Sequence, residues 1–145
     1  MNMPYNALDV AKYIIEQCDI KGKAISNLKL QKIMYFVQAK FLIETGEPCF
    51  NGRIEAWDFG PVVPEVYRKY KIYGSSSIPY IDDGDKVEFE NNDKALIDSV
   101  IDECVRYSAS ALVSITHQHT PWKEAYRTHS RLISNDSIRE YFLRS

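Results

Sequence analysis

The sequence lacks the features that would place it in a membrane or in an oxidising compartment. No apolar run approaches the roughly 20 residues that a helix needs to cross a bilayer, and the N-terminal stretch has no signal-peptide core. Three cysteines, Cys18, Cys49 and Cys104, are odd in number and widely spaced, which fits neither a disulfide framework nor a zinc site. We therefore expect a cytoplasmic protein with free thiols and no contact with a membrane.

Enzyme motifs are also missing. There is no nucleophile elbow, and the six glycines are scattered singly rather than gathered in a phosphate loop. The acidic turn 82–85 lacks the terminal glutamate of a calcium loop. His117 and His119 would point about 200° apart on a helix, so they could not share a metal there. We expect no catalysis, cofactor, metal or small-molecule substrate, and a hydrolase that uses these histidines is the weakest alternative. We expect His117 to end a helix, where its ring can bond a free carbonyl or interact favourably with the helix dipole.

Length and composition indicate one soluble globular domain. The chain has 145 residues, of which 45% are hydrophobic and 26% charged, so we expect a single domain over 1–145. A net charge of −2 offers no overall attraction to nucleic acid. The ten tyrosines suit either the edges of a core or an interaction surface.

Apolar spacing predicts a mainly α fold, a compact helical bundle around a central buried helix over about 26–45. That helix is apolar on two opposed faces, with Lys29, Gln31, Gln38 and Lys40 in the narrow seams between them, so it should be packed on both sides. Alternating residues at 53–57 and 86–90 predict a small two-stranded β element, and 75–85 is the best candidate for a mobile loop. The other helices are expected to begin near Asn6, Pro64, Asn92 or Asp93, Ser108 or Ser110, Thr120, and Ser134 or Asn135.

The stretch 56–74 combines a rigid turn with a short helix. Gly60 and Pro61 are turn residues, and Pro64 suits the first position of a helix. On that helix Val66, Tyr67 and Tyr70 share the inward stripe, while Arg68, Lys69 and Lys71 lie off it. The stretch therefore predicts a tyrosine-lined helix with a basic outer face.

Three blocks of sequence resemble a known family. They are Leu28-Lys29-Leu30-Gln31-Lys32-Ile33-Met34-Tyr35, then Ala56-Trp57 with Gly60-Pro61-Val62 and Val66-Tyr67, then Thr116-His117 with Pro121-Trp122. In this order they resemble the Panacea domain, which includes SocA-like antitoxins and phage-associated GepA-like proteins. Met34 stands where leucine is usual, a tolerable exchange in a core. The motif positions that we expect to act as scaffold are Leu30, Ile33, Tyr35, Trp57, Gly60, Pro61, Val66, Thr116, His117, Pro121 and Trp122.

The resemblance implies an antitoxin that neutralises a cognate protein toxin, encoded by an adjacent gene, through direct contact. Some members instead act as adaptors that deliver a toxin to a cellular protease. The residues that we expect to bind a partner are Lys29, Gln31, Lys32, Tyr67, Arg68, Tyr70, Lys71 and Tyr73. For the first three, an internal carbonyl is an equally good alternative to a partner.

A phage or prophage regulator that binds nucleic acid is the alternative function. Basic residues cluster at 21–32 and 68–71, around what could mimic a helix-turn-helix. However, the loop 19–25 is longer than that motif's turn, and a helix that is apolar on both faces has little surface free for a groove of DNA. DNA is therefore a disfavoured partner.

Overall fold

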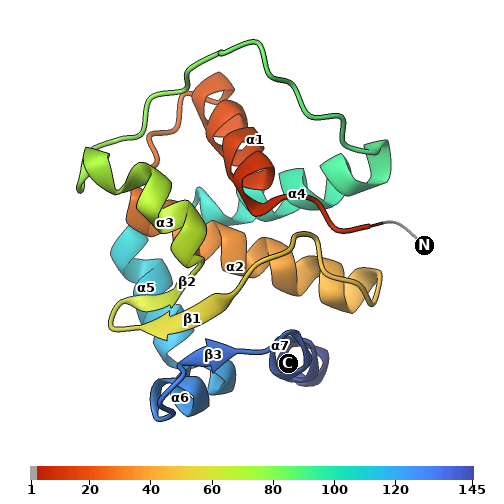
Figure 1. Ribbon diagram of the computed structural model, residues 1–145, viewed down its shortest axis with the longest axis vertical. Coiled ribbons are helices and arrows are strands. Elements are labelled where there is room, and N and C mark those ends of the chain that lie inside the picture. Colours follow the sequence, from red (N-terminus) through yellow and green to blue (C-terminus); the bar gives the residue numbers. More distant parts are fainter. Residues whose placement is uncertain (1–2) are drawn as a thin grey trace.

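The computed structural model describes residues 3–145, and helix α2 crosses the middle of the molecule (Figure 1). Helices α1 and α4 pack on one side of α2, and a small sheet with α7 packs on the other. The helices are α1 (Ala7–Ile20), α2 (Asn27–Glu44), α3 (Pro64–Tyr70), α4 (Asn91–Cys104), α5 (Ala109–His117), α6 (Thr120–Tyr126) and α7 (Asn135–Arg144), with a 3₁₀ turn η1 (Lys71–Tyr73). The strands are β1 (Ile54–Trp57), β2 (Gly60–Val62) and β3 (Leu132–Ile133).

The mainly helical prediction and the central position of α2 are confirmed. Apolar side chains from both of its faces are buried, among them Leu30, Ile33 and Tyr35. Phe36, on the second face, is partly buried and packs edge-on to Phe142 of α7, with their ring centroids 6.1 Å apart. Because α2 is buried along both of its apolar faces, it acts as the core of the fold.

Most of the predicted helix starts are confirmed by their capping bonds. The side chains of Asn6, Ser26, Ser108 and Ser134 each accept a hydrogen bond from a main-chain N–H in the first helical turn. Two predicted N-caps were wrong, although both helices begin close to the expected residues. Glu90 is the N-cap of α4, and the Asp93 carboxylate accepts a hydrogen bond from the Tyr5 hydroxyl at 2.6 Å. His119 is the N-cap of α6, and Thr120 is its first helical residue.

The predicted pairing of 53–57 with 86–90 is wrong. Strand β1 lies between β2 and β3 in an antiparallel sheet, with Trp57 opposite Gly60 and Glu55 opposite Leu132. Residues 86–90 form no strand, because the one buried side chain among them, Phe89, packs between the rings of Tyr5 and Tyr13 from around α1.

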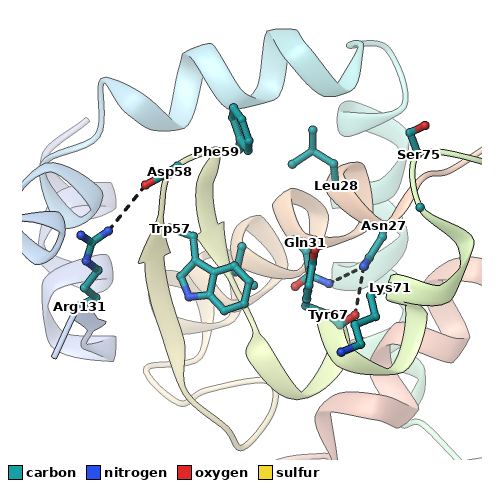
Figure 2. A pocket seen from close by; sticks show the side chains of 12 residues that line it. Asn27, Leu28, Gln31, Trp57, Asp58, Phe59, Tyr67, Lys71, Ser75 and Arg131 are labelled. Atoms are coloured by element: carbon teal, nitrogen blue, oxygen red, sulfur yellow. Dashed lines mark hydrogen bonds and ion pairs between the residues drawn. The ribbon is translucent and has the colours of Figure 1, made fainter.

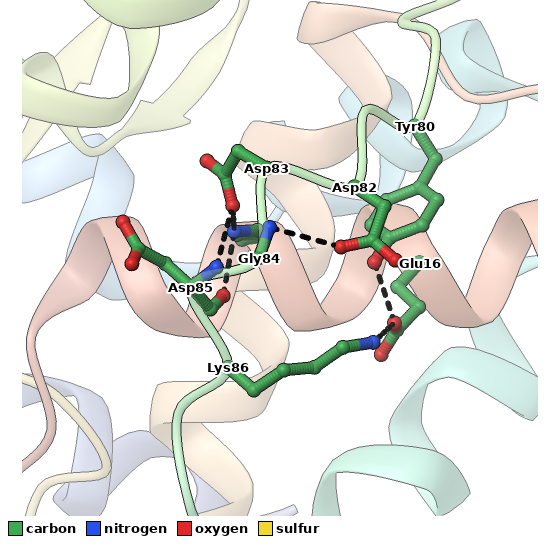
Figure 3. A network of polar contacts seen from close by, with 8 residues as sticks. Glu16, Tyr80, Asp82, Asp83, Gly84, Asp85 and Lys86 are labelled. Carbon is green, nitrogen blue, oxygen red and sulfur yellow. Dashed lines mark hydrogen bonds and ion pairs between the residues drawn. The ribbon is translucent and has the colours of Figure 1, made fainter.

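The segment between η1 and α4 crosses over α1 without helix or strand (Figure 1). The carboxylates of its acidic turn accept hydrogen bonds within the turn and pair with α1, as Figure 3 shows. Asp83 pairs with Lys12, and Glu16 accepts from the Tyr80 hydroxyl at 2.8 Å and from the Lys86 ammonium at 3.0 Å. These contacts tie the segment to α1. Among residues 3–145 no helix is long and apolar enough to span a bilayer.

Candidate protein-interaction site

The tip of the β1–β2 hairpin exposes a large aromatic side chain. Phe59 follows Asp58 in the turn and is 65% exposed. The next residue, Gly60, has a φ of +107°, as its predicted turn role requires. A Cβ atom at Gly60 would lie 2.6 Å from Cε of Lys32 and 2.8 Å from Oγ1 of Thr116. Glycine therefore lets the hairpin sit directly on α2 and α5.

Helices α5 and α6 hold the tip from one side. His117 is the last residue of α5, as predicted, but its Nε2 donates to the carbonyl oxygen of Asp58 in the hairpin at 2.9 Å rather than to a carbonyl of its own helix end. The Asp58 carboxylate accepts from the Tyr126 hydroxyl and pairs with Arg131 at 3.8 Å. Nε1 of Trp122 donates to the carbonyl oxygen of Trp57 at 2.8 Å. The turn is therefore held by hydrogen bonds to two consecutive residues, Trp57 and Asp58.

Lys32 holds the hairpin from beneath. Its side chain is 0% exposed, and Nζ donates to the carbonyl oxygen of Pro61 at 2.9 Å. No carboxylate within residues 3–145 pairs with it, and burial lowers the pKa of Lys32 to about 7. Gln31 beside it accepts from the main-chain N–H of Val63 and donates to Asn27, both at 2.9 Å. Both side chains serve internal groups here.

A groove of about 660 Å³ runs between the hairpin and the α2–α3–η1 face (Figure 2). Trp57 forms one wall, and its ring meets that of Tyr67 edge-on at 5.0 Å. Phe59 and Leu28 lie at one end, and Lys71 lies at the opposite end (Figure 2). The other lining residues are Asn27, Gln31, Asp58, Val62, Gly74, Ser75 and Arg131.

The structure does not bring the predicted partner-binding residues together in one place. Gln31, Tyr67 and Lys71 line the groove, although Gln31 is buried at its floor. Tyr70 and Tyr73, half-buried, line a separate pocket against α1 together with Lys69. Arg68 is exposed on α3. Lys29 is partly exposed beside the thiols of Cys18 and Cys104.

Sequence reasoning missed Phe59 and Leu28. The available signal was the position of Phe59 between Asp58 and Gly60, because a side chain at the tip of a two-residue turn cannot reach a core. An aromatic residue at such a place is a strong candidate for contact with a partner.

The two predicted histidines belong to different environments. His117 touches the hairpin, whereas His119 lies under α7, with Nδ1 hydrogen-bonded to the Tyr35 hydroxyl at 3.0 Å. Burial lowers the pKa of His119 to about 4, so its ring is neutral at pH 7. In the described part of the chain no three His, Cys, Asp or Glu side chains gather in a way that could hold a metal.

Several residues that carry the family resemblance, among them Lys32, Gly60 and His117, meet around this hairpin, and comparison with known proteins gives the family. The chain belongs to the antitoxin SocA-like, Panacea domain family, whose model matches residues 30–123. A curated relative, Antitoxin SocA of Caulobacter vibrioides (strain NA1000 / CB15N), is 42% identical over 73 residues. That match covers 50% of this chain and 39% of the relative, so the chain spans well under two thirds of the relative's length. No solved structure matches.

Proposed function

We propose that this protein is an antitoxin that binds a cognate protein toxin directly and occludes its working surface, without catalysis or a cofactor. The family membership and the named relative support the antitoxin role. All three cysteines are free and buried, which suits a reducing cytoplasm as the place of action.

The choice of the hairpin as the toxin-binding surface is supported by Phe59. Its aromatic ring is exposed on a turn that is fixed by Lys32, His117 and Trp122. A turn whose main chain is already held in place loses little conformational entropy on binding. Aromatic anchors beside a groove supply most of the binding energy in many interfaces. Phe59, Trp57 and Leu28 therefore form the apolar centre of the proposed interface.

Co-expression with the product of the adjacent gene tests the function. The wild-type chain should restore growth and should bring the toxin down in a pull-down. Phe59→Ala should weaken binding by about 2 kcal/mol, roughly 30-fold, because a hot-spot aromatic is truncated. Tyr107→Ala is the matched control, since Tyr107 is 40% exposed in a different groove between α2 and α4.

The outcomes separate the parts of the proposal. If no adjacent gene product is bound or neutralised, the antitoxin role fails. If Phe59→Ala matches the wild type, the contact face is wrong. Toxin abundance, followed by immunoblot, distinguishes two routes to neutralisation: occlusion leaves the amount of toxin unchanged, and delivery to a cellular protease lowers it.

A further inference from the structure

The polar side chains at the floor of the hairpin groove already have hydrogen-bond partners within the protein. Nδ2 of Asn27 donates to the carbonyl oxygen of Tyr67 at 3.1 Å, and the amide of Gln31 is bonded at both ends. No buried side-chain nitrogen or oxygen in residues 3–145 lacks a partner. A group that enters the groove between Trp57 and Leu28 therefore gains from apolar contact alone.

The hairpin edge beside the groove is closed to an added strand. Pro61 has no N–H, and its carbonyl oxygen accepts from Lys32. The N–H of Val63, the next group along the same edge, donates to Gln31. Strand addition requires free main-chain donors and acceptors, so a partner must bind here through its side chains.

The two ends of the groove differ in charge. Phe59 and Leu28 make one end apolar, and the exposed Lys71 marks the other (Figure 2). Within the described chain Lys71 forms no ion pair, whereas Arg131 on the far side of the hairpin is paired with Asp58. The groove therefore has one uncompensated positive charge, at a fixed end.

We infer that the groove receives a toxin segment that places an apolar anchor side chain at one end of the groove and a carboxylate at the other. The anchor packs against Phe59, Trp57 and Leu28, and the carboxylate pairs with Lys71. This inference rests on the proposed function and adds the chemistry and the orientation of the bound segment. Charge at the rim of an interface sets orientation and on-rate, while the apolar centre supplies affinity.

Two short synthetic peptides serve as probes with the full-length chain. One carries two leucines followed by two glutamates, and the matched peptide carries glutamines in place of the glutamates. Amide ¹H–¹⁵N spectra recorded during titration should shift at Leu28, Phe59 and Lys71. At low salt the glutamate peptide should bind about two- to fivefold more tightly than the glutamine peptide, as expected for one exposed charge pair at a rim.

Charge reversal at two neighbouring lysines isolates the contact. Lys71→Glu should abolish the preference for the glutamate peptide. Lys69→Glu changes the net charge equally but lies at the other pocket, so the preference should remain. Equal affinities for the two peptides, shifts confined to Val100, Tyr107 and Phe142 in the second groove, or no shifts at all would each overturn the inference.

The toxin co-expression assay shows whether the inference about the bound segment is wrong or whether the antitoxin role itself is wrong. If the wild type neutralises the toxin and Lys71→Glu does so equally well, the recognition of a carboxylate is wrong and the antitoxin role stands. If the wild type neutralises no adjacent gene product, the antitoxin role fails, whatever the peptides do.

Discussion

Lys32 should make the stability of this protein depend on pH in a way that one substitution removes. Its ammonium lies in the core with the Pro61 carbonyl oxygen as acceptor and no carboxylate nearby in residues 3–145. Burial lowers its pKa from 10.5 to about 7. Between these two values the unfolded chain binds more protons than the folded chain, so stability must rise with pH.

The size of the effect follows from the two pKa values. At pH 6 the lysine is charged in both states, and the folded state bears nearly the whole cost of burying that charge. By pH 9 the folded lysine is neutral, while the unfolded lysine is still mostly charged. Integrating between these limits gives about 3 kcal/mol of added stability from this one group.

Urea unfolding of the wild type and Lys32→Met at a series of pH values tests this value. From pH 6 to pH 9 the unfolding free energy of the wild type should rise by about 3 kcal/mol relative to that of Lys32→Met, because methionine does not titrate. Other titrating groups cancel in the comparison. Lys40→Met, at a partly exposed lysine of the same helix, should follow the wild-type curve. If the plots of unfolding free energy against pH run parallel for the wild type and Lys32→Met, then Lys32 does not have a lowered pKa in the folded protein.

Three further positions, Gly60, Gln38 and His119, give predictions about stability, and Gly84 serves as a control for the first. Gly60→Ala should cost about 3 kcal/mol in urea unfolding, since it adds both a positive-φ strain and a 2.6 Å contact, whereas Gly84→Ala, with no atom within 4 Å, should cost about 1 kcal/mol. Gln38→Met should cost about 3 kcal/mol or more, because it strips the partners from the N–H groups of Cys49 and Phe50 and from the Phe50 carbonyl. The lowered pKa of His119, about 4, makes the unfolded state bind more protons below pH 6.5, so stability should fall by about 2 kcal/mol from pH 7 to pH 5, and His119→Phe should flatten that fall in thermal melts.

The helical part of the fold was predictable because each signal was local. The two apolar faces of α2 predicted its burial, and capping side chains such as Ser26 and Ser134 marked where helices begin. The sheet was not predictable in the same way. Strand β3 has two residues and therefore no detectable period, while the alternation at 86–90 reflects one buried side chain, Phe89, packed on α1.

The candidate site was predictable only in part, because its polar contacts join distant parts of the chain. Tyr67 and Lys71 could be proposed from α3 alone, since aromatic and cationic residues suit interfaces. The partner of Lys32 is Pro61, 29 residues away, and nothing local distinguishes a buried lysine from one in a solvated seam. Phe59 also needed the neighbouring wall of α2 and α3 before a groove could be recognised.

Polar side chains of α2 hold the main chain of neighbouring segments in place. Gln38 binds the main chain at Cys49 and Phe50, and Lys32 and Gln31 bind it at Pro61 and Val63. These side chains form hydrogen bonds with main-chain groups that would otherwise be buried without partners. Inside a sheet, neighbouring strands would supply those bonds.

A partner that docks beside this segment meets a surface that is already ordered, so little binding energy is lost to ordering it. Gln38, far from the groove along α2, should therefore affect affinity through order rather than contact. Gln38→Met should speed hydrogen exchange at the amides of Cys49 and Phe50 and weaken toxin binding without shifting the peptide contacts at Phe59 and Lys71. Slow exchange at those amides in the variant would mean that packing alone, and not the seam of α2, holds the segment in place.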